Sequence, residues 1–90
     1  MQTTDYFAKK LNQPEYQHIQ AQWIISTYTS PEFKFKQSDG RFGLYRKITE
    51  MNNQYLKLVL LKDGKTVRDV YFDKKFNPRA AARLSKMAPY

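Results

Sequence analysis

The sequence predicts an α+β domain, in which N-terminal helices pack on a four-stranded antiparallel meander and a short basic helix follows. Three observations favour this fold. Apolar side chains recur at helical spacing before residue 30, alternation with a period of two follows, and two Asp-Gly pairs stand where tight turns would join strands. Ninety residues have room for only one core, so we expect a single domain over residues 1–90.

Two helices are expected before the strands. The first covers residues 3–11, with Thr4 or Asp5 as its N-cap. Pro14 then suits the first position of a second helix over residues 15–28, because the missing N–H of proline has no partner there in any case. The apolar face of this second helix carries Tyr16, Ile19, Trp23 and Ile24.

The rest of the chain is expected to form strands and a final helix. The strands cover residues 33–36, 41–49, 55–62 and 66–73, and the turns are Asp39–Gly40, Asn52–Asn53 and Asp63–Gly64. The third strand is almost continuously apolar, which predicts a central position in the sheet. In the second strand either Arg46 or Tyr45 must join the apolar side. In the fourth strand, strict alternation places Val67 and Val70 on opposite faces of the sheet. Asn77–Pro78 begins the C-terminal helix.

Charge indicates the class of partner. Sixteen Lys and Arg face eight Asp and Glu, for a formal net charge of +8, which predicts a polyanionic partner. Nucleic acid is favoured, an acidic protein is the alternative, and no membrane partner is expected. Without cysteine, and with one histidine among scattered acids, we expect no metal site and no cofactor. No signal peptide or membrane span is predicted, so the expected location is the cytoplasm.

The only histidine, His18, is the natural candidate for acid–base chemistry. Metal-independent cleavage of RNA needs a base for the 2′-OH, an acid for the leaving oxygen, and cations around the phosphate. In this interpretation Arg41, Arg46 and Lys74 hold phosphate, and Tyr45 or Tyr71 stacks on the nucleotide or donates to it. The further RNA-binding candidates are Lys57, Arg68, Lys75, Arg79 and Arg83, and Lys86 extends this basic tail. Each also has an ordinary interpretation as part of a solvated surface.

The order of motifs resembles a known family. His-Ile-x-x-x-Trp, Ser-Pro-Glu-Phe, DGRF–YRKI, YLKLVLL and YFDKK follow one another over residues 16–76. This series is similar to the barnase–EndoU–colicin–RelE superfamily of small RNases, in its branch of phage-associated and contact-dependent-inhibition toxins. The resemblance implies an RNase fold with His18, Arg41 and Arg46 in the site. Where the family has Thr-Ala-Tyr, this chain has Asp69–Val70–Tyr71, so Asp69 would orient His18 or act as an acid or base itself.

The function that we expect is therefore a metal-independent ribonuclease toxin acting on tRNA or other single-stranded RNA. The resemblance further implies an acidic immunity or inhibitor protein as partner, and the cytoplasm of a target cell as location. Two alternatives stay open. One is a non-enzymatic RNA- or DNA-binding module, and the other is a small basic phage protein that docks on an acidic host protein.

Overall fold

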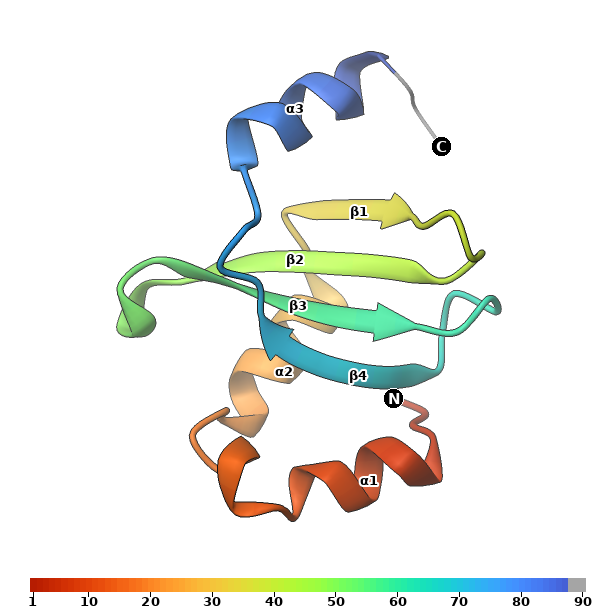
Figure 1. The fold of residues 1–90 in the computed structure, drawn as a ribbon, viewed down its shortest axis with the longest axis vertical. Helices are drawn as coiled ribbons and strands as arrows, with labels where there is room; N and C mark the ends of the chain where they lie inside the picture. Colours follow the sequence, from red (N-terminus) through yellow and green to blue (C-terminus); the bar gives the residue numbers. More distant parts are fainter. Residues whose placement is uncertain (88–90) are drawn as a thin grey trace.

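The computed structural model describes residues 1–87, and their side chains as far as residue 84. Its four strands form one antiparallel sheet in the order β1-β2-β3-β4 (Figure 1). The predicted α+β class, the meander and the C-terminal helix are confirmed. In chain order the elements are α1 (Asp5–Leu11), η1 (Pro14–Tyr16), α2 (Ala21–Thr29), β1 (Phe33–Lys36), β2 (Phe42–Ile48), η2 (Thr49–Met51), β3 (Gln54–Leu60), β4 (Val67–Phe72) and α3 (Pro78–Met87).

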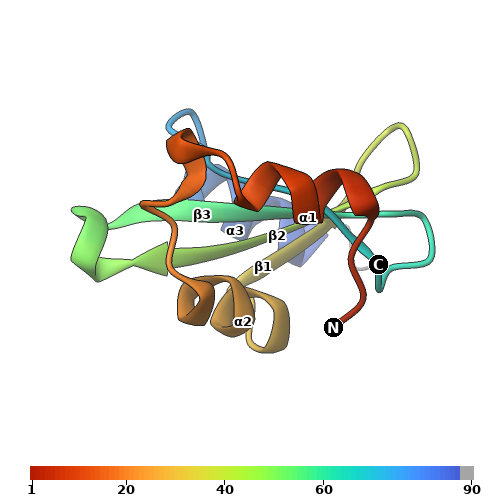
Figure 2. The same ribbon diagram turned by 90° about the horizontal axis from the view of Figure 1, so that it is seen from below.

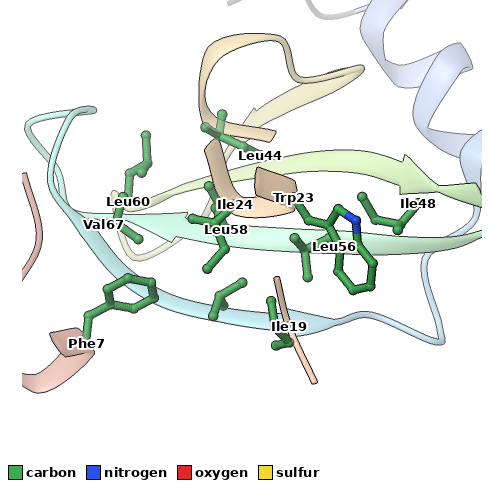
Figure 3. Packing of buried hydrophobic residues seen from close by; sticks show 11 residues of the cluster. Phe7, Ile19, Trp23, Ile24, Leu44, Ile48, Leu56, Leu58, Leu60 and Val67 are labelled. Atoms are coloured by element: carbon green, nitrogen blue, oxygen red, sulfur yellow. The ribbon is translucent and has the colours of Figure 1, made fainter. Parts of the chain in front are cut away.

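The hydrophobic core lies between the sheet and the N-terminal helices. Figure 2 shows α2 on one side of the sheet, whereas α1 runs along its β4 edge. Leu56 and Leu58 of β3 are fully buried, which confirms β3 as the central strand of the core. Trp23 of α2 belongs to the same cluster, as predicted (Figure 3). On the opposite face, no helix among residues 1–87 covers the centre of the sheet, and α3 contacts mainly β1 at its edge.

Local chemistry explains where the elements begin and turn. Thr4 caps α1, because its Oγ1 accepts a hydrogen bond of 3.1 Å from the amide of Phe7. Asn77 caps α3 in the same way, accepting from two amides of its first turn. The two Asp-Gly turns contain Gly40 at φ 89° and Gly64 at φ 70°, where a residue with a Cβ would be strained.

The predicted single helix over residues 15–28 is wrong in its first half. The chain forms the short η1, turns at residues 17–20, and enters α2 only at Ala21. A continuous helix of that length would be a straight rod of about 21 Å. The turn instead lets η1 follow α1 while α2 passes beneath β2 and β3. His18 therefore lies in a connection between two helices and not on a helix.

The predicted strict alternation of side chains between the two faces of the sheet is also wrong for β4. Val67 pairs with Leu60, whereas Asp69 pairs with Val59, so Arg68 is an extra residue opposite that step. This bulge brings both Val67 and Val70 into the core, where each is fully buried.

The N-terminus pairs with the outer edge of β4 at Val67, the first residue of that strand. The amide of Val67 donates to the carbonyl of Gln2 at 2.9 Å, and its carbonyl accepts from the amide of Thr4 at 3.0 Å. This parallel bridge satisfies groups that an exposed edge strand would otherwise leave open to pairing with another chain.

Candidate nucleic-acid interface

A row of aromatic and basic side chains crosses the face of the sheet that points away from α2. Phe33 is paired with Tyr45, Tyr45 with Lys57, and Lys57 with Tyr71. Residues directly opposite each other on neighbouring strands project to the same face, so these four side chains form one line. The strand register also decides which residue of β2 lies on which face: Tyr45 lies on this face and Arg46 lies on the other. We call the surface of Phe33, Phe35, Tyr45, Tyr55, Lys57, Tyr71 and Phe76 the aromatic face.

The chain after β4 covers one half of the aromatic face. Figure 1 shows this segment passing from β4 across the neighbouring strands to α3, beyond β1. It lays the ring of Phe76 on that of Tyr45, with 4.1 Å between ring centres, and 4.8 Å from that of Tyr55. Tyr45 is consequently only 9% exposed, whereas Tyr71 is 38% exposed. The half around Lys57 and Tyr71 is the part that a ligand can reach.

Lys57 is a half-buried cation between two tyrosines. Its Nζ lies 5.3 Å from the centre of the Tyr45 ring and 5.7 Å from that of Tyr71. Burial, the largest effect, lowers the pKa of Lys57, but the favourable interaction of the ammonium first with the Tyr45 side chain and then with that of Tyr71 outweighs burial, so the pKa is raised. Within the described side chains the ion pairs involve other residues, so this ammonium has no carboxylate partner. A permanent charge without a counter-ion attracts an anion.

Gly43 makes this placement of Lys57 possible. A Cβ at residue 43 would lie 3.1 Å from Cε of Lys57 and 3.3 Å from Cε1 of Tyr45. The lysine stem therefore crosses the glycine, and a larger residue at this position would displace it.

A pocket of about 310 Å³ adjoins the aromatic face at the end of β4. His18 lines it with an exposed side chain, whose ring stacks on that of Phe72 with 6.1 Å between centres. Tyr71 belongs both to this pocket and to the aromatic face. The structure thus brings together three residues singled out from the sequence: His18, Tyr71 and Lys74. The contributions of Tyr16 and Gln54 to the pocket had no signal in the sequence. We call it the His18 pocket.

Arg41 lies at the other end of the sheet. It precedes β2, whereas the His18 pocket is at the far end of that strand, where Ile48 pairs with Gln54. The seven residue steps from Arg41 to Ile48 separate the two places by about 23 Å. The Arg41 guanidinium instead faces the Asp39 carboxylate at 3.8 Å. His18 and Arg41 therefore do not form one compact site.

Arg46 lies on the helix side of the sheet. Its Nη1 donates to the carbonyl of Ser30 at 2.8 Å, which ties β2 to the end of α2. It lines a separate pocket with Trp23, so it does not join the His18 pocket either.

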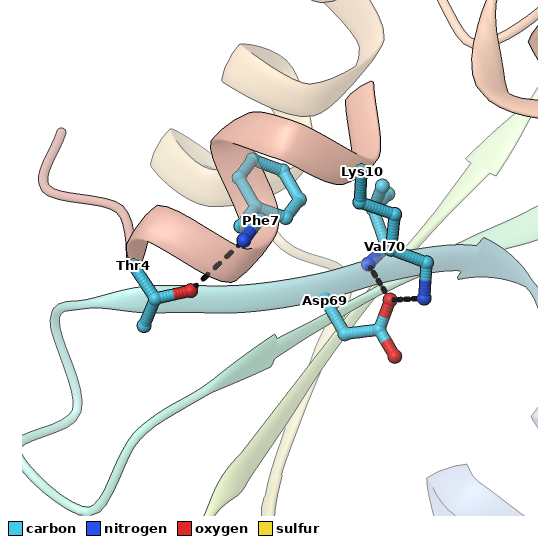
Figure 4. A network of polar contacts seen from close by, with 5 residues as sticks. All are labelled: Thr4, Phe7, Lys10, Asp69 and Val70. Carbon is cyan, nitrogen blue, oxygen red and sulfur yellow. Dashed lines mark hydrogen bonds and ion pairs between the residues drawn. The ribbon is translucent and has the colours of Figure 1, made fainter. Parts of the chain in front are cut away.

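Asp69 is bound to Lys10 rather than to His18. The Lys10 Nζ donates to Oδ1 of Asp69 at 2.5 Å, and the amide of Val70 donates to the same oxygen at 2.8 Å (Figure 4). Burial is the largest effect on Lys10 and lowers its pKa, but the hydrogen bond to Asp69 contributes to a net rise. This pair joins α1 to β4, and its two members are too far apart in sequence for any local pattern to reveal it.

The remaining basic candidates are spread over the surface. Arg68 lies over the ring of Tyr6, 5.3 Å from its centre, beside α1. Lys75 follows β4, and its amide donates to Asp73. Arg79 and Arg83 are exposed on α3, while the side chain of Lys86 lies outside the described part of the chain.

Comparison with protein families, with curated proteins and with solved structures finds no match to the chain. Among residues 1–87, no helix has the length and apolar character needed to cross a bilayer. The described residues also contain no group of three His, Cys, Asp or Glu side chains placed to hold a metal ion.

Proposed function

We propose that the protein is a metal-independent endoribonuclease that cleaves tRNA or other single-stranded RNA. One observation carries the proposal. A potential acid or base, a hydroxyl group and a cation, provided by His18, Tyr71 and Lys74, line one pocket. Tyr71 connects this pocket to the protonated Lys57 on the aromatic face.

An RNA strand would bind across both surfaces. A phosphate would pair with Lys57, and a base would stack on the exposed ring of Tyr71. The next phosphate would then enter the His18 pocket beside Lys74. Single-stranded RNA suits this arrangement because its bases are free to stack on aromatic side chains.

The chemistry requires one proton to leave and one to be supplied. His18 takes the proton of the 2′-OH, and the 2′-oxygen attacks phosphorus as the bond to the 5′-oxygen breaks. Lys74 stabilises the charge on the phosphate oxygens. The 5′-oxygen is protonated by the Tyr71 hydroxyl, and the proton that His18 took returns to Tyr71 through water, which restores both side chains. The products are a 2′,3′-cyclic phosphate and a 5′-OH.

Two further proposals concern partners and location. An acidic immunity or inhibitor protein would present carboxylates in place of RNA phosphates to Lys57 and Lys74. As a delivered toxin domain, the protein would act in the cytoplasm of the target cell. Both follow from the family resemblance and from the net charge of +8.

A second candidate function is RNA or DNA binding without cleavage. It is favoured by the surroundings of His18, whose ring stacks on Phe72 but has no hydrogen-bond partner within the described part of the chain. A catalytic histidine is usually held by such a bond. The aromatic face and Lys57 serve binding equally well in either case. A third candidate, docking on an acidic protein, would use the same cations without any RNA.

Incubation with total tRNA in EDTA separates these functions. The ribonuclease proposal predicts fragments whose 3′ ends carry a 2′,3′-cyclic phosphate, which mass spectrometry distinguishes from a linear phosphate. Intact RNA together with measurable binding would support the binding module. Absence of both would favour protein docking, and cleavage that EDTA abolishes would contradict the metal-independent mechanism.

A further inference from the structure

A second pocket lies on the helix side of the sheet, between α2 and the end of β2 with η2. Its volume of about 420 Å³ is within the range of roughly 300–1,000 Å³ that is usual for small-molecule sites. Gln22, Trp23 and Ser26 line it from α2, and Arg46 lines it from β2. We call it the Arg46 pocket. It shares no lining residue with the His18 pocket.

Trp23, one of the residues that line this pocket, has a buried indole N–H without a hydrogen-bond partner among the described residues. Trp23 is 6% exposed, and its buried Nε1 has no acceptor at hydrogen-bond distance among the described residues. Indole can only donate, so this atom calls for an acceptor. Buried polar groups in folded proteins are almost always paired, with protein, water or ligand.

Arg46 adds a cation with unused donors. One guanidinium nitrogen is bound to the carbonyl of Ser30, while the other N–H groups have no acceptor in the described part of the chain. A guanidinium presents five N–H donors in a planar fork that fits two oxygens of a phosphate. Ser26 and Gln22, four residues apart on α2, supply a hydroxyl and an amide that can donate as well.

One group in the pocket opposes an anion. The Glu50 carboxylate also lines it, and hydrogen bonds from its own amide first and from Thr49 next lower the pKa of Glu50. The indole of Trp23 makes the smallest contribution to this lowering, and the geometry at Nε1 does not reach that of a hydrogen bond. Glu50 is therefore ionised at neutral pH and would weaken an anion site without filling it.

We infer that the Arg46 pocket binds a phosphate group, held by the guanidinium of Arg46 and the indole N–H of Trp23. The phosphate belongs either to a small phosphate compound or to the backbone of a bound RNA strand. The site stands on its own donors, so it does not depend on cleavage in the His18 pocket.

The single tryptophan makes the site directly observable, because ¹⁵N-labelled protein gives one indole N–H resonance. We would follow this resonance while adding inorganic phosphate at constant ionic strength, and separately a single-stranded oligonucleotide without terminal phosphates. The inference predicts a saturable shift with at least one of the two ligands. A response to inorganic phosphate assigns the site to small phosphates, and a response to the oligonucleotide alone assigns it to the RNA backbone.

Four variants test the assignment to Arg46. Arg46→Gln should weaken binding at least about tenfold, since it removes a charged hydrogen-bond pair. Lys62→Gln, which removes a charge in the exposed turn after β3, should leave the shift intact, and Glu50→Gln should tighten binding. If Arg46→Gln does not fold, Arg46→Lys should still show weaker binding, because it keeps the charge but loses the fork. No saturable shift with either ligand would overturn the inference, as would an equal shift in Arg46→Gln.

Discussion

Lys57 shows how a residue gains a special property from neighbours that only the fold reveals. In the sequence it is one of several lysines, and its alternation in a strand favours a solvated position. The strand register places it between Tyr45 and Tyr71, and Gly43 leaves room for its stem. His18, by contrast, could be identified from the sequence alone, because it is the only side chain with an ordinary pKa near neutrality.

Replacement of Lys57 by Met tests the binding role of this charge. Methionine keeps much of the stem across Gly43 but removes the ammonium, so RNA affinity should fall while the fold is retained. The salt dependence should become shallower by about 0.7 in log–log slope, the share of one phosphate contact on a single strand. Fluorescence anisotropy at several salt concentrations would measure both. Lys62→Met, in the exposed turn after β3, is the control and should change neither quantity appreciably.

At the scale of elements, the sequence predicted the types of the helices and strands better than the residues at which they begin and end. The Asp-Gly turns and the apolar third strand gave the meander correctly. The break at residues 17–20 carries no Gly or Pro, and it arises because η1 and α2 pack against different parts of the sheet. The bulge at Arg68 arises similarly, because burying both Val67 and Val70 is worth more than regular pairing.

The ion pair of Lys10 and Asp69 should hold α1 against β4. With side chains only 14% and 18% exposed, it lies between a surface pair, worth up to about 1 kcal/mol, and a buried one, whose breakage costs about 3–5 kcal/mol. We expect Asp69→Asn to lower the free energy of unfolding by about 1–3 kcal/mol. Urea denaturation would measure this, with Glu15→Gln on exposed η1 as the control.

The same pair predicts a dependence on alkaline pH. The pKa of Lys10 is raised above its ordinary value of 10.5, so its stabilisation is complete below that pH and is lost as the pH rises beyond it. The difference in stability between wild type and Asp69→Asn should therefore be constant from neutral pH to about 10 and should narrow only above that. If the stability difference between wild type and Asp69→Asn already narrows near pH 8, the Lys10–Asp69 pair is not its source.

Asp63 makes the turn between β3 and β4 sensitive to acid. It accepts hydrogen bonds from the Thr66 hydroxyl and from the amides of Thr66 and Lys65, which lower its pKa to about 2. A lowered pKa stabilises the fold above the ordinary value of 3.8, and this contribution is lost as the pH falls toward 2. Thermal unfolding should show wild type more stable than Asp63→Asn at pH 5, with a smaller difference at pH 2.5.

At the scale of the whole molecule, the charge predicts how RNA binding responds to salt. If the aromatic face, the His18 pocket and their basic surroundings contact about four phosphates, the log–log slope of affinity against salt should be near −3 on single-stranded RNA. Titrations between low and physiological salt would measure it. A flat response would contradict the nucleic-acid functions and favour an acidic protein as partner.

The distribution of basic residues could not be predicted from their number. Arg41 and Arg46, expected beside His18, lie at the opposite end and on the helix side of the sheet respectively. Their positions depend on the direction of the strand and on the face of the sheet to which each side chain points. The imperfect alternation in β2 did not decide which face Arg46 occupies. Lys74 and Tyr71 do line one pocket with His18, because the end of β4 lies near the turn that follows η1.

The most direct test of the central claim is single-turnover cleavage of a single-stranded RNA by wild type and His18→Phe, with protein in excess and EDTA present. Phenylalanine preserves the stacking on Phe72 but cannot transfer a proton. We predict a rate at least about 100-fold lower with unchanged RNA affinity, since positioned acids and bases contribute about 100- to 10,000-fold. A 2′-deoxy version of the strand should bind wild type and stay intact. Full activity of His18→Phe, or cleavage of the 2′-deoxy strand, would contradict the claim.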